Sequence, residues 1–349
     1  MSRPLTAAVE ARGLSKIYKT TRAVDDISIH IPAGVCCGFL GKNGAGKTTT
    51  LKMLVGLKRP TSGEISIMGE PQIYGAPTQL PFGYLPDVPN YYGYMTGPEF
   101  LTLCAKLCGI PANLRKAKVT QLLETVGLSR ARSTIAGYSR GMKQRLGIAQ
   151  ALINDPAVVF MDEPISALDP IGRRDVTEII RTLKQKGDTT VILSTHILAD
   201  VEDVCDYVLI IEHGKIMAQD YLTNLKRKHR RNEAVVRFHE SAMAERFAAA
   251  ADDGIFTLEV TSPVQFTARL CQTAPDAPPT DEQCDIASAA LSRAVNAVLH
   301  ANDLSIESYA AHSPSLEDIF LEVIKPANQR STPTTHNPAA QNETEVRHA

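Results

Sequence analysis

The stretch Gly41-Lys42-Asn43-Gly44-Ala45-Gly46-Lys47-Thr48 matches the pattern G-x-x-x-x-G-K-S/T at every fixed position. It follows the apolar run from Val35 to Leu40, which predicts a buried strand that leads into the loop. The glycines of this pattern let backbone N–H groups close around phosphates, and the loop opens a helix whose N-terminus favours anions. Lys47 supplies a positive charge for the outer phosphates, and the Thr48 hydroxyl can hold magnesium. The stretch therefore predicts a nucleoside triphosphate site in an α/β fold.

Two other apolar runs end in polar residues. The run from Ala157 to Met161 leads directly into Asp162 and Glu163, and the run from Thr190 to Leu193 leads to His196. The carboxyl ends of parallel strands meet at one edge of a sheet, so we expect these side chains to gather near the loop. Asp162 is then placed to reach the magnesium, Glu163 to orient or deprotonate an attacking water, and His196 to face the terminal phosphate.

The composition is that of an ordinary globular protein with two domains. The chain has 349 residues and a formal net charge of -1, so no overall basic field draws it to nucleic acid, and we expect no nucleic-acid partner. No apolar run reaches the roughly 18 residues of a membrane span, and the first residues lack the apolar core of a secretory signal, so we expect a cytoplasmic chain. The seven cysteines have no zinc spacing, and we expect Cys104 and Cys108 to pack in a helix core as reduced thiols.

A further stretch makes a family resemblance specific. Tyr138-Ser139-Arg140-Gly141-Met142-Lys143-Gln144-Arg145 resembles the signature motif of ATP-binding cassette (ABC) proteins, and Ser166-Ala167-Leu168-Asp169 resembles their D-loop. His196 matches the switch histidine of that family. Tyr18 matches the aromatic that stacks on adenine, with a strand aromatic packed in the core as the alternative. The resemblance runs from about Glu10 to Leu222, and by it the chain resembles the nucleotide-binding subunit of an ABC transporter.

The resemblance implies an ATPase fold, a P-loop cassette with a helical subdomain, whose cofactors are ATP and Mg2+. It implies catalytic roles for Lys47, Glu163 and His196. It implies magnesium ligation by Thr48, Asp162 and Asp87. The nucleotide contacts that it implies are Tyr18, Gly41, Asn43, Gly44, Ala45, Gly46, Lys47, Thr48, Thr49, Ser139, Gly141 and Asp169.

Asp87 departs from the family pattern. In Phe82-Gly83-Tyr84-Leu85-Pro86-Asp87, the aspartate stands where the family usually has a glutamine. A carboxylate there can hold magnesium through water, but it adds a negative charge beside Asp162 and Glu163, and like charges resist joint ionisation. We therefore expect one of two outcomes: Asp87 makes the site depend more heavily on magnesium, or it faces solvent and contacts a membrane permease.

The resemblance also implies partners. In this family the signature of one subunit covers the ATP on the phosphate loop of another, and this chain carries one of each motif, which indicates a homodimer. Cargo passes through a separate permease, so we expect the chain at the inner face of the membrane. The ending Ser315 to Glu322 and the signature variant Ser139 to Met142 favour an ABC-2 type exporter over an importer. A non-transport ABC ATPase that acts on ribosomes or DNA is a third alternative, but the chain has neither the second cassette nor the long coiled coil of those types.

The sequence divides into a cassette, a linker, an accessory domain and a tail. We expect the ABC ATPase domain at 1–225, with two helices between Met95 and Leu128 as its helical subdomain. A basic linker follows at 226–232, either a solvated hinge or a contact to anionic lipid. The remaining regions are a small α+β domain at 233–325 and a disordered tail at 326–349. In the small domain the pattern predicts strands at 234–238, 255–260 and 304–309, and helices at 243–251, 286–299 and 316–324.

Overall fold

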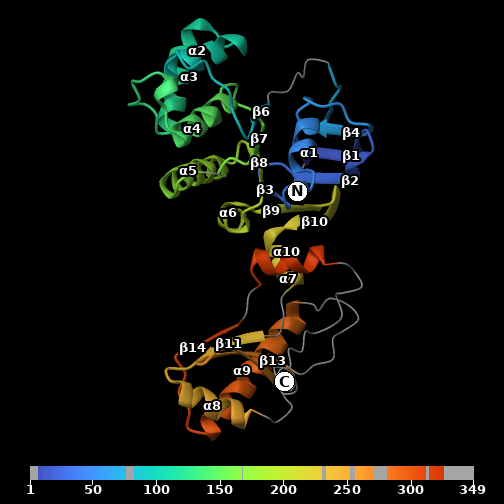
Figure 1. The fold of residues 1–349 in the computed structure, drawn as a ribbon, viewed down its shortest axis with the longest axis vertical. Helices are drawn as coiled ribbons and strands as arrows, with labels where there is room; N and C mark the ends of the chain where they lie inside the picture. The colour runs from blue at the N-terminus through green and yellow to red at the C-terminus, as the bar shows by residue number, and fades with distance from the viewer. Residues whose placement is uncertain are drawn as a thin grey trace, which may run out of the picture.

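The structure is a computed structural model that describes residues 7–75, 82–166, 168–229, 233–251, 256–270, 281–311 and 314–325. Figure 1 shows a larger body, formed mainly by 7–229, above a smaller body, formed by 233–311. The predicted tail at 326–349 lies outside the described residues. Among the described helices, none combines the length and apolar character that a membrane span needs.

A six-stranded sheet forms the centre of the larger body. Its order is β10-β9-β3-β8-β7-β6, with β3 (Cys36–Leu40), β6 (Phe82–Leu85), β7 (Val158–Asp162), β8 (Thr190–Thr195), β9 (Tyr207–Glu212) and β10 (Lys215–Tyr221). The strands β9, β3, β8, β7 and β6 run parallel, and β10 pairs antiparallel with β9. Every residue of β3, β7, β8 and β9 is buried, because helices and a second sheet cover both faces. This burial explains why these strands read as nearly continuous apolar runs.

The second sheet is antiparallel and positions the first helix. Its order is β2-β1-β4-β5, with β1 (Ala7–Tyr18), β2 (Thr21–Pro32), β4 (Ser62–Ile67) and β5 (Glu70–Pro71). Helix α1 (Lys47–Leu54) shares one hydrophobic cluster with both sheets, because Leu51 and Leu54 are buried together with Ile29 and Phe160. The phosphate loop joins β3 to α1, so packing of both elements fixes its two ends.

Helices gather beside the central sheet and include the expected helical subdomain. They are α2 (Gly97–Leu107), α3 (Ala112–Thr125), α4 (Arg140–Ala151), α5 (Pro170–Lys186) and α6 (Leu198–Val204), with a 3-10 turn at Ile135–Gly137 (Figure 1). Thr96 begins α2 with a capping box, because its hydroxyl accepts the Glu99 N–H and the Glu99 carboxylate accepts the Thr96 N–H. Cys104 packs against the core, whereas Cys108 is exposed, so the expected core packing holds for Cys104 alone.

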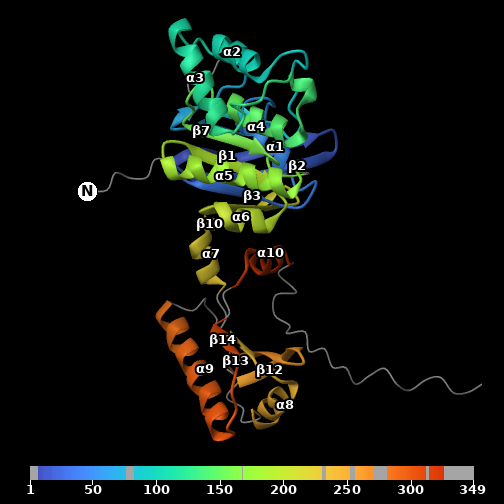
Figure 2. The same cartoon turned by 90° about the vertical axis from the view of Figure 1, so that its left-hand side faces the viewer.

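The smaller body has its own sheet and core. Its sheet order is β12-β13-β11-β14, with β11 (Glu233–Arg237), β12 (Phe256–Ser262), β13 (Gln265–Leu270) and β14 (Ser308–Ala311); its helices are α8 (Ser241–Ala250) and α9 (Asp281–Ala301). Phenylalanines from both sheet and helix, among them Phe238, Phe247 and Phe266, form its core. In Figure 2 α9 runs along one side of the sheet. Strand β13 was not expected from the sequence, and β14 begins at Ser308 rather than at 304.

The last helix corrects the expected domain boundary. Helix α10 (Leu316–Ile324) buries Leu316, Ile319, Phe320 and Val323 in the core of the larger body, against α6 and α7 (Leu222–Lys228). The range 233–325 is therefore not one domain, because the apolar stripe of α10 packs on the cassette. Figure 2 shows α10 between the two bodies, directly below α6.

The basic stretch also differs from its prediction. Residues Lys226 to Lys228 belong to α7, so the expected linker at 226–232 begins inside a helix, and 230–232 lie outside the described residues. Lys226 forms an ion pair with Glu202, and Lys228 forms one with Asp220 at 2.7 Å. These two ammonium groups are thus paired with carboxylates of the larger body.

Candidate active site

The order of the central strands brings three chain segments to one edge. Strand β8 lies between β3 and β7, and in the parallel register Leu40 pairs with Thr195 while Asp162 pairs with Ser194. The loop that starts at Gly41, the acid at Glu163 and the histidine at His196 therefore all emerge from the carboxyl edge of neighbouring strands.

The phosphate loop needs its glycines. Gly44 and Gly46 have φ of +83° and +113°, in the region that residues with a Cβ rarely adopt. A Cβ at Gly46 would lie 2.8 Å from the Ala23 carbonyl oxygen, and one at Gly41 would collide with the Ile211 carbonyl oxygen. Gly46 is also the N-cap of α1, so the backbone N–H groups at the start of that helix face the loop's interior.

Lys47 is held inside this loop. Its side chain is only 6% exposed, and its ammonium donates to the carbonyl oxygens of Gly41 at 2.6 Å and Lys42 at 3.3 Å. The same nitrogen lies 3.5 Å from Glu163 Oε1. A buried cation at the start of a helix is a strong anion-binding group, because little water competes for it.

Asp162 and Thr48 form an oxygen-rich corner. The Thr48 hydroxyl donates to Asp162 Oδ1 at 3.1 Å, and the Ser194 hydroxyl donates to the same oxygen at 2.6 Å. Burial raises the pKa of the Asp162 carboxyl; hydrogen bonds from Ser194 and Thr48 oppose this effect, and the charge of Asp87 adds to it. Carboxylate and hydroxyl oxygens this close together fit the hard ligands that Mg2+ requires. The sequence did not point to Ser194, although a polar residue ending a buried strand is a usable signal.

Glu163 contacts groups from three parts of the site. Its backbone has φ of +50°, an uncommon conformation for a residue with a side chain, and its N–H donates to the Ser194 carbonyl oxygen at 3.1 Å. His196 Nδ1 lies 3.0 Å from Glu163 Oε2, and the Ser166 hydroxyl donates to that oxygen. The carboxylate thus contacts Lys47 at the start of α1, His196 just after β8, and Ser166 in the turn that follows β7. Its geometry suits a base that accepts a proton beside bound phosphate.

Asp87 lies near this acid pair without a direct bond to it. The side chain is exposed, and no hydrogen bond or ion pair of Asp87 occurs among the residues that the structure describes. Burial raises the pKa of the Tyr84 phenol to about 12, and the charges of Asp162 and Asp87 contribute to the rise. Asp87 is therefore close enough to act on Asp162 through its charge.

Tyr18 lies at the end of β1, near the start of α1. Its ring is 37% exposed and belongs to neither core cluster of the larger body, which excludes the alternative of a core aromatic. Burial raises the pKa of the phenol, but hydrogen bonds with Lys58 and Thr49 outweigh burial and hold the pKa below its usual value. The ring is therefore available to stack on a planar group.

A second group of expected site residues lies at the starts of α4 and α5 and not at the phosphate loop. It consists of Ser139, Gly141 and Asp169. Ser139 caps α4 by accepting the Met142 N–H, and Asp169 caps α5 by accepting the Gly172 N–H. Gly141 and Gly172 bring the two helix starts together, since a Cβ at Gly141 would lie 3.6 Å from the Gly172 Cα. Within the described residues no hydrogen bond or ion pair joins this place to Gly41–Thr49. In Figure 1 α4 and α1 lie on opposite sides of β6, β7 and β8.

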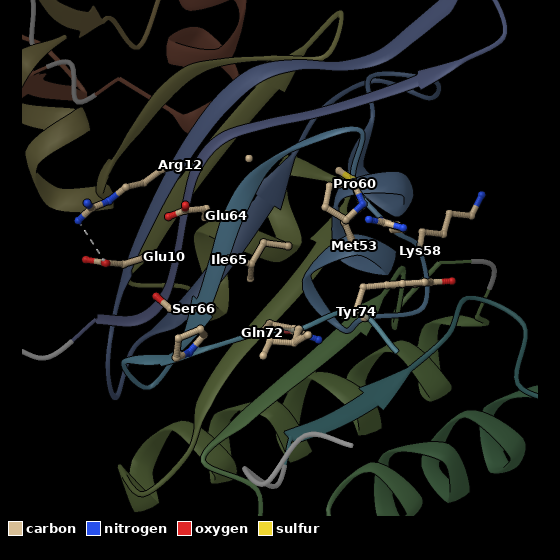
Figure 3. Close-up of a pocket in the computed structure, with 15 residues that line it drawn as sticks. Glu10, Arg12, Met53, Lys58, Pro60, Glu64, Ile65, Ser66, Gln72 and Tyr74 are labelled. Atoms are coloured by element: carbon tan, nitrogen blue, oxygen red, sulfur yellow. Dashed lines mark ion pairs between the residues drawn. The ribbon is translucent and has the colours of Figure 1, made fainter. Parts of the chain in front are cut away.

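A cavity of about 800 Å³ lies outside this arrangement. Its lining comes from β1, the end of α1, β4 and the segment after β5, and includes Met53, Ile65 and Gln72 (Figure 3). None of the residues expected at the site lines it. We therefore assign the chemistry to the strand edge and not to this cavity.

Comparisons with known proteins show the family of this chain. A family model described as ABC transporter matches residues 24–166. The chain is 33% identical over 336 residues to the daunorubicin/doxorubicin resistance ATP-binding protein DrrA of Streptomyces peucetius, covering 94% of this chain and 96% of that protein. It is 38% identical over 229 residues to the bacitracin transport ATP-binding protein BcrA of Bacillus licheniformis, covering 65% and 74%.

Solved structures show the same fold. The structure of an ATP-binding subunit of an ABC transporter is 32% identical, with a TM-score of 0.56 over 63% of this chain and 92% of that one. A dimeric ATP-binding cassette with bound ADP and Pi has a TM-score of 0.55 over 61% of this chain and 98% of that one. At 22% identity, the second likeness concerns the fold alone.

Proposed function

This chain belongs to the ATP-binding subunits of ABC transporters, and we propose that it hydrolyses ATP in a site completed by a second copy, to drive export through a separate permease. The observation that carries the proposal is Glu163, whose carboxylate contacts Lys47 and His196 at one sheet edge. In the proposed site Thr48 and Asp162 would ligate magnesium directly, and Asp87 would do so through a water molecule. Magnesium bound there would neutralise charge on the phosphates.

The side chains divide the work of hydrolysis. The loop N–H groups and Lys47 bind the β- and γ-phosphates and hold the terminal phosphorus near Glu163. Glu163 orients a water for in-line attack and accepts its proton, while His196 keeps the carboxylate turned toward that water. Tyr18 stacks on the adenine.

The separation of the two halves of the site supports the proposed dimer. Ser139 and Gly141 lie at the start of α4, where N–H groups favour an anion, yet they do not contact the phosphate loop of their own chain. Two copies placed with each α4 start against the other's loop would hold two ATP between them.

Changing Ser139 to arginine tests this arrangement. The bulky side chain blocks the α4 start, so we expect ATP binding by one chain to persist while turnover falls about 100-fold or more, the scale of losing preorganised donors. Turnover is measured as phosphate release and binding by equilibrium dialysis. Ser129→Arg, an exposed change in the same subdomain, is the matched control and should hydrolyse ATP normally.

Mixing two inactive variants makes the test sharper. In a mixed dimer of Ser139→Arg and Lys47→Ala chains, one of the two sites combines an intact loop with an intact signature. Mixing should therefore restore turnover, at no more than one of the two sites in each dimer. Normal hydrolysis by purified Ser139→Arg alone would be incompatible with a shared site.

Export is supported by the relatives. DrrA is named for daunorubicin and doxorubicin resistance, BcrA for bacitracin transport, and another relative, 39% identical over 215 residues, for Nod factor export. We infer that this chain also powers an exporter and is held at the inner membrane face by its permease. Copurification of membrane partners with this chain in mild detergent tests the inference. An exporter permease would support it. An importer permease would instead support an importer subunit, and ribosomes would support a non-transport ABC ATPase.

The charge of Asp87 gives a metal-dependent prediction. Burial is the main cause that raises the pKa of Asp162, and the negative charge of Asp87 adds to the rise, so Asp87→Asn removes a like charge from the magnesium corner. If Asp87 belongs to the metal shell, the magnesium concentration for half-maximal ATPase should shift at least about twofold, by the ordinary size of one charge interaction near a surface. An unchanged magnesium curve with impaired transport would assign Asp87 to the permease contact instead.

A further inference from the structure

Two lysines surround the Tyr18 ring. The Lys58 ammonium donates to the Tyr18 hydroxyl at 2.8 Å and lies 4.7 Å from the ring centroid. The Lys16 ammonium lies 5.3 Å from the same centroid and donates to the Arg59 carbonyl oxygen at 2.6 Å. Neither lysine forms an ion pair with a carboxylate in the described part of the chain. Their polar contacts are thus with the tyrosine and its supporting turn.

The turn that carries Lys58 is fixed to the helix that follows the phosphate loop. The Lys58 N–H donates to the Lys52 carbonyl oxygen, in α1, at 2.8 Å. The Thr61 N–H donates to the Ser15 carbonyl oxygen at 2.8 Å, and the Thr61 hydroxyl accepts the Ile17 N–H at 3.1 Å. Lys58 therefore links the end of α1 to the strand end that carries the ring.

The Lys58 side chain is directed toward this ring and not toward the neighbouring cavity. Lys58 is among the residues that line the cavity of Figure 3, but its ammonium points outward from it. The charged hydrogen bond to Tyr18 is of the stronger kind, because one partner is ionised. A partly exposed ring would otherwise rotate among several positions, and ordering it on ATP binding would cost affinity.

We propose that Lys58 is a positioning residue for the nucleotide base: it holds the Tyr18 ring at a fixed place relative to α1, so that the ring is ready to stack on adenine. The inference rests on the proposed function, which places ATP at the loop and its base on Tyr18. Lys58 contributes to affinity through the base, whereas Lys47 contributes through the phosphates. The ligand part that Lys58 serves is therefore the aromatic purine.

Lys58→Met keeps much of the side-chain length but removes the donor. We expect it to raise the KM and Kd for ATP about 3- to 10-fold, the scale of one ordinary net hydrogen bond, because Lys58 acts on the base only through the position of the ring; kcat should change little. Binding of magnesium tripolyphosphate, which has no base, should not change. Lys58→Arg keeps a charged donor and should recover most of the affinity. Lys116→Met, an exposed lysine of α3, is the matched control.

A double-mutant cycle with Tyr18→Phe isolates the contact. Because Tyr18→Phe removes the hydroxyl that Lys58 contacts, the double variant should bind ATP no more weakly than the weaker single variant. Equal weakening of ATP and tripolyphosphate by Lys58→Met would overturn the inference, since Lys58 would then act as a point charge on phosphate. Unchanged ATP affinity in folded Lys58→Met, or additive effects in the cycle, would also overturn it.

The failure of the underlying proposal has a separate signature. Tyr18→Ala should weaken ATP binding more than Lys58→Met does. If Tyr18→Ala leaves ATP affinity unchanged, the base does not stack on Tyr18, and the proposed function is wrong in that respect whatever Lys58 does. Thermal unfolding of each variant distinguishes a local loss of affinity from loss of the fold. If Lys58→Met does not fold, the ATP affinities of Lys58→Arg and Tyr18→Phe test the inference instead: the first should stay near the wild-type value and the second should fall.

Discussion

Replacing Glu163 by glutamine is expected to leave ATP binding intact and to lower ATP turnover about 100- to 10,000-fold, the range that a positioned general base contributes. The amide keeps the shape of the side chain and can still lie beside Lys47 and His196. It cannot accept the proton of the attacking water. Turnover is measured as phosphate release at saturating ATP and magnesium, and binding by equilibrium dialysis.

The control for this variant is a surface glutamate away from the site. Glu178 lies on α5 and contacts Arg181 at the surface, so Glu178→Gln removes a carboxylate without touching the strand edge. It should hydrolyse ATP at the normal rate. Wild-type turnover by Glu163→Gln would remove Glu163 from the mechanism.

Replacing Lys47 by alanine is expected to abolish both binding and turnover. The ammonium is buried in the loop, where it donates to the Gly41 carbonyl oxygen, and with ATP bound it would donate charge-assisted hydrogen bonds to phosphate oxygens. Each such bond contributes about 1.5–3 kcal/mol, so ATP affinity should fall about 100-fold or more. Isothermal titration with ATP and magnesium measures the loss.

Lys42→Ala is the matched change for Lys47. Lys42 lies in the same loop, but its side chain is 61% exposed and contacts Glu212, so its loss should weaken ATP binding far less. Equal loss of affinity in both variants would show that general charge, and not the position of Lys47, holds the nucleotide. Thermal unfolding of Lys47→Ala checks that the buried loop still folds.

The gathering of these side chains at the strand edge could be predicted because each part has a local signal. An apolar run marks a strand buried on both faces, and the residues that end it mark the sheet edge, as Glu163 and His196 do. The glycines at 44 and 46 mark backbone conformations that other residues avoid. Each of these signals comes from residues that are adjacent in the chain, so it can be recognised in a single sequence.

The remaining features depend on contacts between distant segments. The apolar stripe of α10 predicts a helix, but it does not say whether Phe320 packs on the smaller body or returns to α6 and α7. Similarly, the pairing of Lys58 with Tyr18 joins residues forty positions apart, and only the fold brings them together. Strand β13 could have been found, because Phe266 and Ala268 alternate with polar residues.

The central claim, that two copies share each ATP, is tested most directly by the mass of Glu163→Gln in solution. Light scattering at saturating ATP and magnesium should give the mass of two chains, and the same protein with ADP should give the mass of one. Adding Ser139→Arg to Glu163→Gln should return the mass with ATP to that of one chain. A one-chain mass for Glu163→Gln with ATP shown to be bound would contradict the shared site.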